Sequence, residues 1–444
     1  MCGIFGITDN KEASRLTYIG LFALQHRGQE SAGIASESNR KLVYYNSMGL
    51  VNEVFNESII AGLKGRNSIG HVRYSTTGSS DVSNAQPLYF NSKFGEIALS
   101  HNGNIINSGE LKAELRNLGA IFQSTTDSEI IVHLISRHKS HDLIEALKEN
   151  LPKLKGSYSF LFLTKKELIA ARDPYGFRPL FYGKKDNSYV FASETCAIDA
   201  VKAKLIGEIE PGEIAVARSG KLKKIRFSNS KKYSRCIFEQ VYFARPDSFF
   251  CGHSVQSARY EIGKLLAMEY KIKADIVSGV PDSGTAYALG FSKQANIEYK
   301  TVFMRNRYSQ RSFIQPKQSA REFTAEMKLS PIKDVIKGNS LILIDDSLVR
   351  GTTSQKIVKS LKDCGAKKVI MLIASPPVKF PCVYGIDTAR KEELIANKLS
   401  IKEICKFIGA DELHYLSLDN LINGCGRGDI NFCHACFSGN YPEK

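Results

Sequence analysis

The stretch from Leu341 to Ser354 constrains the fold of this chain more than any other part of its sequence. Its apolar start predicts a buried strand, and two adjacent carboxylates, Asp345 and Asp346, stand where that strand ends. A loop and the start of a predicted helix then supply further polar groups: Ser347, Arg350, Gly351, Thr352 and Thr353. Hydroxyls and N–H groups at a helix N-terminus bind phosphate, and carboxylates bind ribose hydroxyls or hydrated Mg²⁺. The alternative is a strand–turn–helix with an acidic N-cap and no ligand.

Similar segments surround this stretch in the second half of the chain. Apolar strands are expected at 274–279, 339–345 and 368–374, with helices at 254–267 and 353–364. Apolar strands that alternate with helices predict an α/β fold with a parallel, doubly wound sheet. Such sheets bind their ligands at the carboxyl ends of the strands. The tail from Thr388 is expected to be mostly helical.

The first residues, Met1 to Ile7, allow two interpretations. Cys2 is either a small apolar residue of a buried first strand or a nucleophile that removal of Met1 exposes. Removal of Met1 would leave one residue with both a thiol and an α-amine, and the ordinary pKa of that amine is about 7.7–8.0. An amine of this kind can act as the general base for the thiol of the same residue.

Up to about residue 228 the sequence shows short strands, turn signals and a few helices, which predicts a layered antiparallel α+β fold. Four stretches place polar groups where strands end: 26–28, 71–76, 101–104 and 126–129. Each has a structural explanation when taken alone. Asn102-Gly103 is a common turn, Asp127 stands beside a helix start, and Arg73 suits a surface ion pair. The basic segment Lys221–Arg235 is interpreted as the start of a crossing between two domains.

Together with Cys2, these stretches resemble the class II glutamine amidotransferases, the N-terminal-nucleophile family, in order and spacing over the first two hundred residues. The resemblance implies that Cys2 attacks the side-chain amide of glutamine. It implies that the Asn102 side chain and the N–H of Gly103 form the oxyanion hole. Arg73 would pair with the α-carboxylate of the substrate, and Asp127 with its α-ammonium.

The 341–354 stretch resembles the phosphoribosyl-diphosphate loop of type I phosphoribosyltransferases, and residues 280–285 resemble their pyrophosphate-side loop. The resemblance implies Mg²⁺ at Ser283, Asp345 and Asp346. It implies that substrate is bound by both acids and by Ser347, Arg350, Gly351, Thr352 and Thr353. Residues 305–316 resemble the flexible lid of that family, in which Arg305 and Arg307 would close over the diphosphate. The lid departs from the family pattern at Ser309-Gln310 and Ser312, and Ala286 stands where proline is expected.

A chain with both halves in this order resembles the glutamine phosphoribosylpyrophosphate amidotransferases. The resemblance implies glutamine-dependent formation of 5-phosphoribosylamine, the first step of de novo purine synthesis. It also implies a homo-oligomer, a tetramer, that purine nucleotides inhibit. The expected organisation is a glutamine amidotransferase domain at 2–228, a crossing at 229–254, a phosphoribosyltransferase domain at 255–387 and a helical tail with a cysteine pair at 388–444.

Ten cysteines in a chain with no secretory signal are expected to stay reduced. Cys433 and Cys436 have a chelate spacing but cannot complete a four-ligand site alone. The iron–sulfur branch of the resembled family has cysteines in the contexts of Cys236, Cys382, Cys433 and Cys436. The resemblance therefore implies a 4Fe–4S cluster held by these four residues, and zinc is the alternative.

Composition limits the remaining function classes. The net charge of +16 suits a nucleic acid, a small polyanion or a solvated surface, but the lysines are scattered and no nucleic-acid-binding signature is present. No apolar run approaches the length of a membrane span, so we expect a cytoplasmic protein without membrane or nucleic-acid partners. Two alternatives remain: another class II amidotransferase, and a non-catalytic regulator that senses phosphoribosyl diphosphate and binds nucleic acid.

Overall fold

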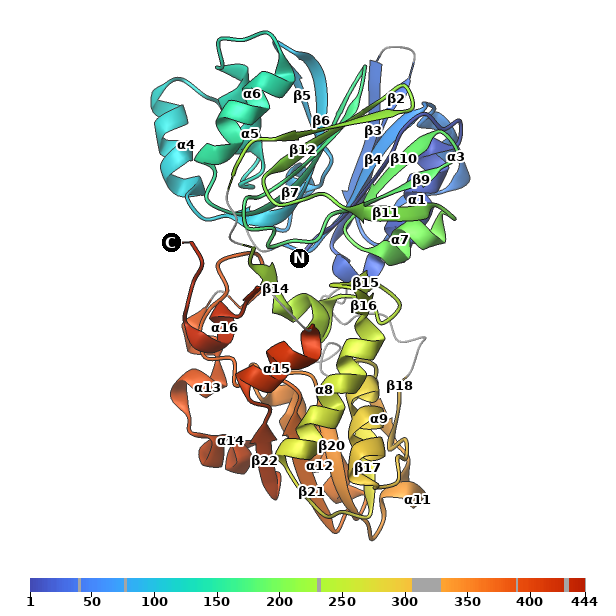
Figure 1. The fold of residues 1–444 in the computed structure, drawn as a ribbon, viewed down its shortest axis with the longest axis vertical. Coiled ribbons are helices and arrows are strands. Elements are labelled where there is room, and N and C mark those ends of the chain that lie inside the picture. The colour runs from blue at the N-terminus through green and yellow to red at the C-terminus, as the bar shows by residue number, and fades with distance from the viewer. Residues whose placement is uncertain are drawn as a thin grey trace.

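The computed structural model describes residues 1–38, 41–75, 78–229, 233–305, 329–388, 390–426 and 431–443. Most of the predicted lid, including Arg307, lies outside these residues. Figure 1 shows two lobes: sheets in blue and green form the upper lobe, and yellow to red helices around a smaller sheet form the lower one.

Two antiparallel sheets stack face to face in the upper lobe, which confirms the predicted layered α+β fold. The seven-stranded sheet has the order β11 (Lys204–Glu208), β9 (Phe181–Lys185), β10 (Ser188–Ala192), β1 (Gly3–Ile7), β4 (Asn67–Arg73), β2 (Ser31–Ser38) and β3 (Lys41–Met48). The six-stranded sheet has the order β13 (Lys221–Arg226), β12 (Glu213–Arg218), β8 (Leu168–Arg172), β7 (Gly156–Thr164), β6 (Gly95–Ile105) and β5 (Leu88–Ser92).

Alternation along the strands separates the two faces of each sheet. On β1, Ile4 packs into the core between the sheets, whereas Phe5 packs on the outer face under Gly20 of α1. Helices α1 (Ala13–Ala23), α2 (Val51–Val54), α3 (Glu57–Gly62) and α7 (Thr195–Ala200) lie with the seven-stranded sheet. Helices α4 (Ser108–Asn117), α5 (Glu129–Ser136) and α6 (Leu143–Asn150) cover the six-stranded sheet.

The lower lobe contains the predicted parallel sheet, in the order β17 (Ile276–Gly279), β20 (Ser340–Asp345), β21 (Lys368–Ile373) and β22 (Glu412–Tyr415). Alternate residues of β20 face opposite cores: Ile342 packs with α8 (Val255–Glu269) and α9 (Gly284–Ala295). Leu343 packs with α12 (Thr352–Asp363) and α14 (Ile401–Ile408). Helices therefore cover both faces, as a doubly wound sheet requires.

Two sequence expectations are corrected here. The tail, expected to be mostly helical, contains α13 (Ile395–Lys398), α14, α15 (Leu418–Cys425) and α16 (Ala435–Ser438), but β22 also adds an edge strand to the parallel sheet. The stretch Lys221–Arg226 forms edge strand β13, whereas we expected it to begin the crossing. Lysines on an exposed edge discourage pairing with other chains, and they also hide the apolar alternation that identifies a strand.

Short elements join the lobes. They are β14 (Arg235–Cys236), the π-type turn η4 (Glu239–Phe243), β15 (Phe249–Phe250) and β16 (His253–Ser254). From the end of the chain, β23 (Phe432–Cys433) pairs in parallel with β14. The remaining described elements of the lower lobe are β18 (Phe303–Arg305), β19 (Leu329–Pro331) and α11 (Lys333–Ile336). Across the described ranges, no helix has the length and apolar character to span a bilayer.

Candidate active site

The first candidate centre lies where β1 and β4 meet at the edge of the upper lobe. Because Gly3 pairs with Val72 in antiparallel register, Cys2 stands at the strand ends next to Arg73. The backbone N–H of Cys2 donates to Oδ1 of Asn102 at 3.2 Å, and its Sγ lies 3.6 Å from the carbonyl oxygen of Tyr74. Cys2 is partly exposed, so it is not the buried apolar cysteine of the alternative interpretation.

Asn102 and Gly103 lie beside this thiol on β6. The Asn102 side chain is fully buried, and its Nδ2 has no hydrogen-bond partner among the described residues. Buried donors are nearly always satisfied, so this one is placed for an acceptor that a ligand would bring. A Cβ at Gly103 would come within 2.1 Å of the Ser157 carbonyl oxygen, so only glycine fits. The pair has the donors and the bare backbone that an oxyanion hole requires.

The Arg73 side chain is buried at the end of β4. Its Nη1 donates to Oε1 of Glu30 at 2.6 Å and to the carbonyl of Ser79 at 3.1 Å. The sequence analysis did not identify Glu30, because nothing in the sequence shows that residue 30 lies opposite residue 73. An arginine held in one orientation by a carboxylate is preorganised for a second anion.

Asp127 precedes helix α5 and is buried. Its Oδ2 accepts the N–H of Ile105 at 2.7 Å, so the carboxylate contacts the strand that carries Asn102. The segment before Asp127 is tied to the loop after β4 through Asn84, whose Nδ2 donates to the Ser79 carbonyl at 2.8 Å and to Thr125 Oγ1 at 2.7 Å. These contacts bring the Arg73 and Asp127 ends of the centre together.

The second candidate centre lies at the carboxyl ends of β17 and β20 in the lower lobe. Asp346 accepts hydrogen bonds through Oδ2 from the Ser283 hydroxyl at 2.5 Å and through Oδ1 from the Ser347 hydroxyl at 2.6 Å. The Asp346 N–H donates to Oδ1 of Asp345 at 3.0 Å. The two predicted loops therefore meet at this edge, as parallel strands require.

Burial raises the pKa of both Asp345 and Asp346, and the negative charge of Asp346 raises the pKa of Asp345 further. Two adjacent carboxylates with little access to water disfavour each other's ionisation unless a cation is present. Oxygen ligands of this kind are those that Mg²⁺ prefers. The donor set therefore fits a magnesium ion.

The loop after Asp346 leads into α12. Gly351 has φ of +77°, a conformation that suits glycine, and Thr352 and Thr353 form the first turn of the helix. Arg350 does not point freely into the centre, because its Nε donates to Glu393 at 2.9 Å. Arg305 pairs with Asp282, next to Ser283. Neither carboxylate partner was expected from the sequence.

The four predicted cysteine ligands lie together between the lobes. Cys236 pairs with Cys433 across the β14–β23 bridge, and α16 carries Cys436. One small cavity is lined by all four thiols and by aromatic and apolar groups: Cys236, Cys382, Cys433, Cys436, Phe177, Tyr384, Ile386, Ala435 and Tyr441. Burial raises the pKa of the Cys236 thiol to about 11 and raises the pKa values of Cys433 and Cys436 as well.

Four thiols around one cavity fit the donor set of a metal centre, and a bound metal would hold them as thiolates despite their burial. Within the described residues, however, no three His, Cys, Asp or Glu side chains are already arranged to hold a metal ion.

The cysteine cavity adjoins the first centre. Asn104 Nδ2 donates to the Val383 carbonyl, and the Ser157 hydroxyl donates to the Tyr384 carbonyl, both at 2.8 Å. A Cβ at Gly385 would lie 3.2 Å from the carbonyl group of Gly103. The loop that carries Cys382 therefore packs directly against the predicted oxyanion hole.

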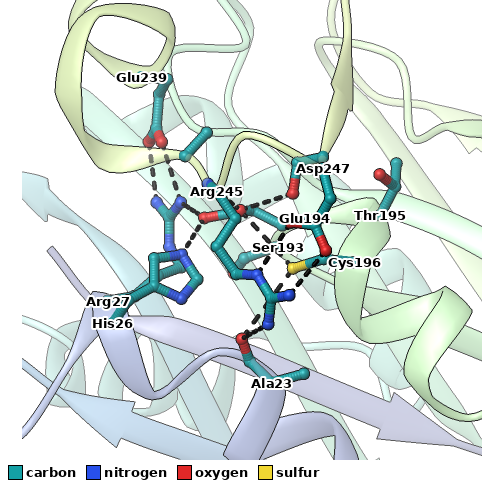
Figure 2. A network of polar contacts seen from close by, with 12 residues as sticks. Ala23, His26, Arg27, Ser193, Glu194, Thr195, Cys196, Glu239, Arg245 and Asp247 are labelled. Atoms are coloured by element: carbon teal, nitrogen blue, oxygen red, sulfur yellow. Dashed lines mark hydrogen bonds and ion pairs between the residues drawn. The ribbon is translucent and has the colours of Figure 1, made fainter. Parts of the chain in front are cut away.

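A buried charge network lies behind Cys2, and Figure 2 shows most of it. Arg27, in the short turn η1 (Gln25–Arg27), donates from Nε to the Cys2 carbonyl at 2.9 Å. Its guanidinium also contacts Glu194 and Glu239. The sequence placed His26-Arg27-Gly28 at a strand end but gave Arg27 no role, because both of its carboxylate partners lie more than a hundred residues away.

These features define a class: an N-terminal cysteine glutamine amidotransferase joined to a doubly wound domain with the acidic loop of a phosphoribosyltransferase. The family described as "Glutamine amidotransferase domain" matches residues 71–200. The amidophosphoribosyltransferase of Bacillus subtilis is 46% identical over 100% of this chain and 94% of its own length. That of Methanocaldococcus jannaschii is 46% identical over 100% and 98%.

A solved structure of the Bacillus subtilis glutamine phosphoribosylpyrophosphate amidotransferase, in complex with ADP and GMP, superposes with a TM-score of 0.94. It is 46% identical and covers 100% of this chain and 98% of its own. The chain belongs to the amidophosphoribosyltransferase family, so the predicted family, fold class and enzyme class are confirmed.

Proposed function

We propose that the chain makes 5-phosphoribosylamine, glutamate and pyrophosphate from phosphoribosyl diphosphate, glutamine and water, as the first step of purine synthesis. One observation carries the proposal: the same chain holds Cys2 against Asn102 in one lobe and Asp346 against Ser283 in the other. The first pair suits release of ammonia from glutamine, and the second suits use of that ammonia at a phosphoribosyl centre. The non-catalytic regulator explains the second pair but not the first.

In the first half-reaction, removal of Met1 would turn the N–H that Cys2 now donates to Asn102 into an α-amine beside the thiol. The amine takes the thiol proton and the sulfur attacks the glutamine amide carbon. The negative charge that develops on the amide oxygen is stabilised by hydrogen bonds from Nδ2 of Asn102 and from the backbone N–H of Gly103. The protonated amine gives this proton to the departing nitrogen and ammonia leaves, and water then hydrolyses the thioester to glutamate and regenerates the thiol. Arg73 and Asp127 hold the α-carboxylate and α-ammonium of the substrate.

In the second half-reaction, Ser283, Asp345 and Asp346 would hold Mg²⁺, which neutralises charge on the leaving pyrophosphate when it is bound. The loop of Ser347, Arg350, Gly351, Thr352 and Thr353 would bind the 5-phosphate and ribose. Arg305 and Arg307 would cover the diphosphate. Arg305 now pairs with Asp282, so it must leave this carboxylate to bind the substrate oxygens. Ammonia attacks C1 and pyrophosphate leaves, so the protein acts by positioning.

We propose that Cys236, Cys382, Cys433 and Cys436 hold a 4Fe–4S cluster with a structural role. The support is a small cavity lined by four thiols and aromatic rings, whose residues come from the tail and from both lobes. Zinc is the alternative, since four thiolates suit it too. Metal and sulfide analysis of anaerobically purified protein separates them: about four iron and four sulfide per chain is expected, and stoichiometric zinc without sulfide would contradict the cluster.

We further propose a cytoplasmic homotetramer that purine nucleotides inhibit and that has no nucleic-acid partner. The Bacillus subtilis relative was solved with ADP and GMP, which supports nucleotide binding in this chain. We retain the domain limits 2–228, 229–254, 255–387 and 388–444, with β22 included in the last segment. Size-exclusion chromatography with light scattering, and activity with AMP or GMP added, test the assembly and the inhibition.

The decisive experiment measures pyrophosphate release from phosphoribosyl diphosphate and Mg²⁺, with either glutamine or ammonium, for the wild type and Cys2→Ala. The wild type should use both nitrogen sources, and the variant ammonium only. Release with ammonium but never with glutamine would mean that the upper lobe is misassigned or that Met1 is retained. A folded wild type without either activity would overturn the proposed function.

A further inference from the structure

Cys2 is fixed at both of its backbone ends by two residues of the upper lobe that lie far apart in the sequence. Its N–H is held by Asn102 of the same lobe, and its carbonyl accepts Nε of Arg27 at 2.9 Å. After loss of Met1, Cys2 would be the first residue, with a free amine and a rotatable thiol on one Cα. The hydrogen bond from Arg27 to the Cys2 carbonyl would then fix the position of this terminal residue on its carbonyl side.

Arg27 is itself held by two carboxylates inside the protein. Its side chain and that of Glu239 are both fully buried. Nη1 of Arg27 donates to Oε2 of Glu239 at 2.9 Å and Nη2 donates to Oε1 at 2.8 Å, a bidentate pair of fixed geometry. Burial disfavours the charged guanidinium, but the attraction of Glu239 and Glu194 outweighs it and raises the pKa of Arg27 above its ordinary value. Arg27 is therefore cationic at every physiological pH.

The second carboxylate, Glu194, serves several other groups as well. Figure 2 shows it beside His26 and Arg245. Its Oε1 lies 2.8 Å from Nε2 of His26. Its Oε2 accepts hydrogen bonds from the backbone N–H of Arg245 at 2.9 Å and from the Ser248 hydroxyl at 2.7 Å. Glu194 thus joins the crossing to the upper lobe through several groups. Among the described residues, Glu239 is the one that accepts hydrogen bonds from both terminal nitrogens of Arg27.

Glu239 belongs to the crossing and is positioned from the lower lobe. It starts η4, whose carbonyls are held by two helices of the phosphoribosyltransferase-like domain. Arg259 of α8 donates to the carbonyl of Gln240 at 2.8 Å and to that of Ala244 at 2.9 Å. The Tyr287 hydroxyl of α9 donates to the carbonyl of Val241 at 2.8 Å. Helix α9 begins directly after Ser283.

From these contacts we propose that Glu239 is a positioning residue for the glutaminase nucleophile: it clamps Arg27, which fixes the carbonyl of Cys2 and thereby the direction of its amine and thiol. The proposal rests on the function proposed above. It means that the glutaminase centre is completed by a residue outside the glutaminase lobe, one that the lower lobe holds in place. A purely structural ion pair between lobes would instead affect stability and both half-reactions together.

The test compares Glu239→Gln with Glu208→Gln. Glu208 is a matched control because it also joins the upper lobe to the crossing, pairing with Arg172 at 2.8 Å and Arg235 at 3.4 Å, and it makes no contact with Arg27. Three quantities are measured for each: kcat and KM with glutamine, the rate of pyrophosphate release with ammonium, and the rate at which a diazoketone analogue of glutamine alkylates Cys2.

For Glu239→Gln we expect kcat with glutamine and the Cys2 alkylation rate to fall about tenfold to a hundredfold, since small displacements of a reacting group cost that much. The KM for glutamine should change less than about threefold, because Arg73 and Asp127 remain, and the ammonium rate should stay within about twofold. Glu208→Gln should match the wild type in all three.

A Glu239→Gln enzyme with normal kcat for glutamine would overturn the proposal, and so would equal losses with glutamine and with ammonium. If this variant does not fold, Arg27→Lys is tested in its place. Lysine keeps the positive charge, but its single ammonium group cannot donate to the Cys2 carbonyl and make a bidentate pair with Glu239 at the same time. Selective loss of glutamine-dependent activity in Arg27→Lys supports the clamp, and unchanged activity refutes it. A wild type inactive with both nitrogen sources would instead refute the proposed function.

Discussion

Oδ1 of Asn102 accepts a hydrogen bond from the backbone N–H of Cys2 at 3.2 Å, while Nδ2 of the same side chain is buried without a hydrogen-bond partner in the described part of the chain. One amide group thus fixes the nucleophile with its acceptor end and keeps its donor end available. The arrangement separates two roles that substitution can test one at a time.

Asn102→Asp keeps an acceptor for Cys2 but removes the Nδ2 donor. We expect kcat for glutamine hydrolysis to fall about 10²–10³-fold, the usual cost of losing one oxyanion donor. Ammonium-dependent release of pyrophosphate should be unchanged, because the lower lobe is untouched. Equal activity of variant and wild type with glutamine would show that Asn102 does not stabilise the oxyanion.

Asp346→Asn removes the buried member of the two adjacent carboxylates at the carboxyl end of β20. We expect pyrophosphate release to fall about a hundredfold with either nitrogen source and the Mg²⁺ requirement to shift to higher concentration, since metal ions supply several kcal/mol to such steps. Asp334→Asn is the control, because Asp334 is exposed on α11. A variant that saturates at the wild-type Mg²⁺ concentration would contradict the magnesium assignment.

Gly385→Ala tests the contact between the cysteine-bearing loop and the oxyanion hole. The new methyl would press on the Gly103 carbonyl group at 3.2 Å, so kcat with glutamine should fall about tenfold while ammonium still supports release. Gly338→Ala is a matched control, because Gly338 also has positive φ, +77° against +97° at Gly385, but has open space around its Cβ position. If both variants lose glutamine activity equally, backbone strain and not the contact is responsible.

His71 makes the upper lobe sensitive to acid. Burial disfavours the imidazolium and lowers the pKa of His71 to about 3, whereas the unfolded chain takes up this proton near its ordinary pKa of 6.5. The contribution of His71 to the free energy of unfolding is therefore complete above pH 6.5 and is lost as the pH falls towards 3. Urea midpoints followed by circular dichroism should drop less steeply over this range for His71→Leu than for the wild type. Parallel curves would show that His71 does not bind this proton on unfolding.

Sequence reasoning predicted the fold class because both halves carry strong local signals. Cys2 after Met1, and the acidic pair at the end of the Leu341–Ile344 strand, are recognisable without knowledge of any partner. The structure brings Cys2, Arg73, Asn102, Gly103 and Asp127 together, and it brings Ser283 to Asp346. Cys2, Arg73 and Asp346 lie at or next to strand ends, as expected, whereas Asn102 and Gly103 lie within β6, which continues to Ile105.

What the sequence did not show is which distant charge completes each pair. Glu30 opposite Arg73, Glu393 on Arg350 and Glu239 on Arg27 are contacts between elements with no fixed spacing. The edge strand β22 was missed for a related reason. Glu412–Tyr415 is four residues long and half polar, and only its pairing with β21 makes it a strand.

The β14–β23 bridge has a consequence for how the protein is made. It joins Cys236 to Cys433, so the cavity of four thiols has no wall on one side until the lower lobe between these residues has formed. Contacts between segments so distant in sequence form late, because the loop between them must first be ordered. The thiols of a growing chain would therefore stay accessible until assembly is almost finished. Burial of these thiols is therefore among the last steps by which the two lobes become joined.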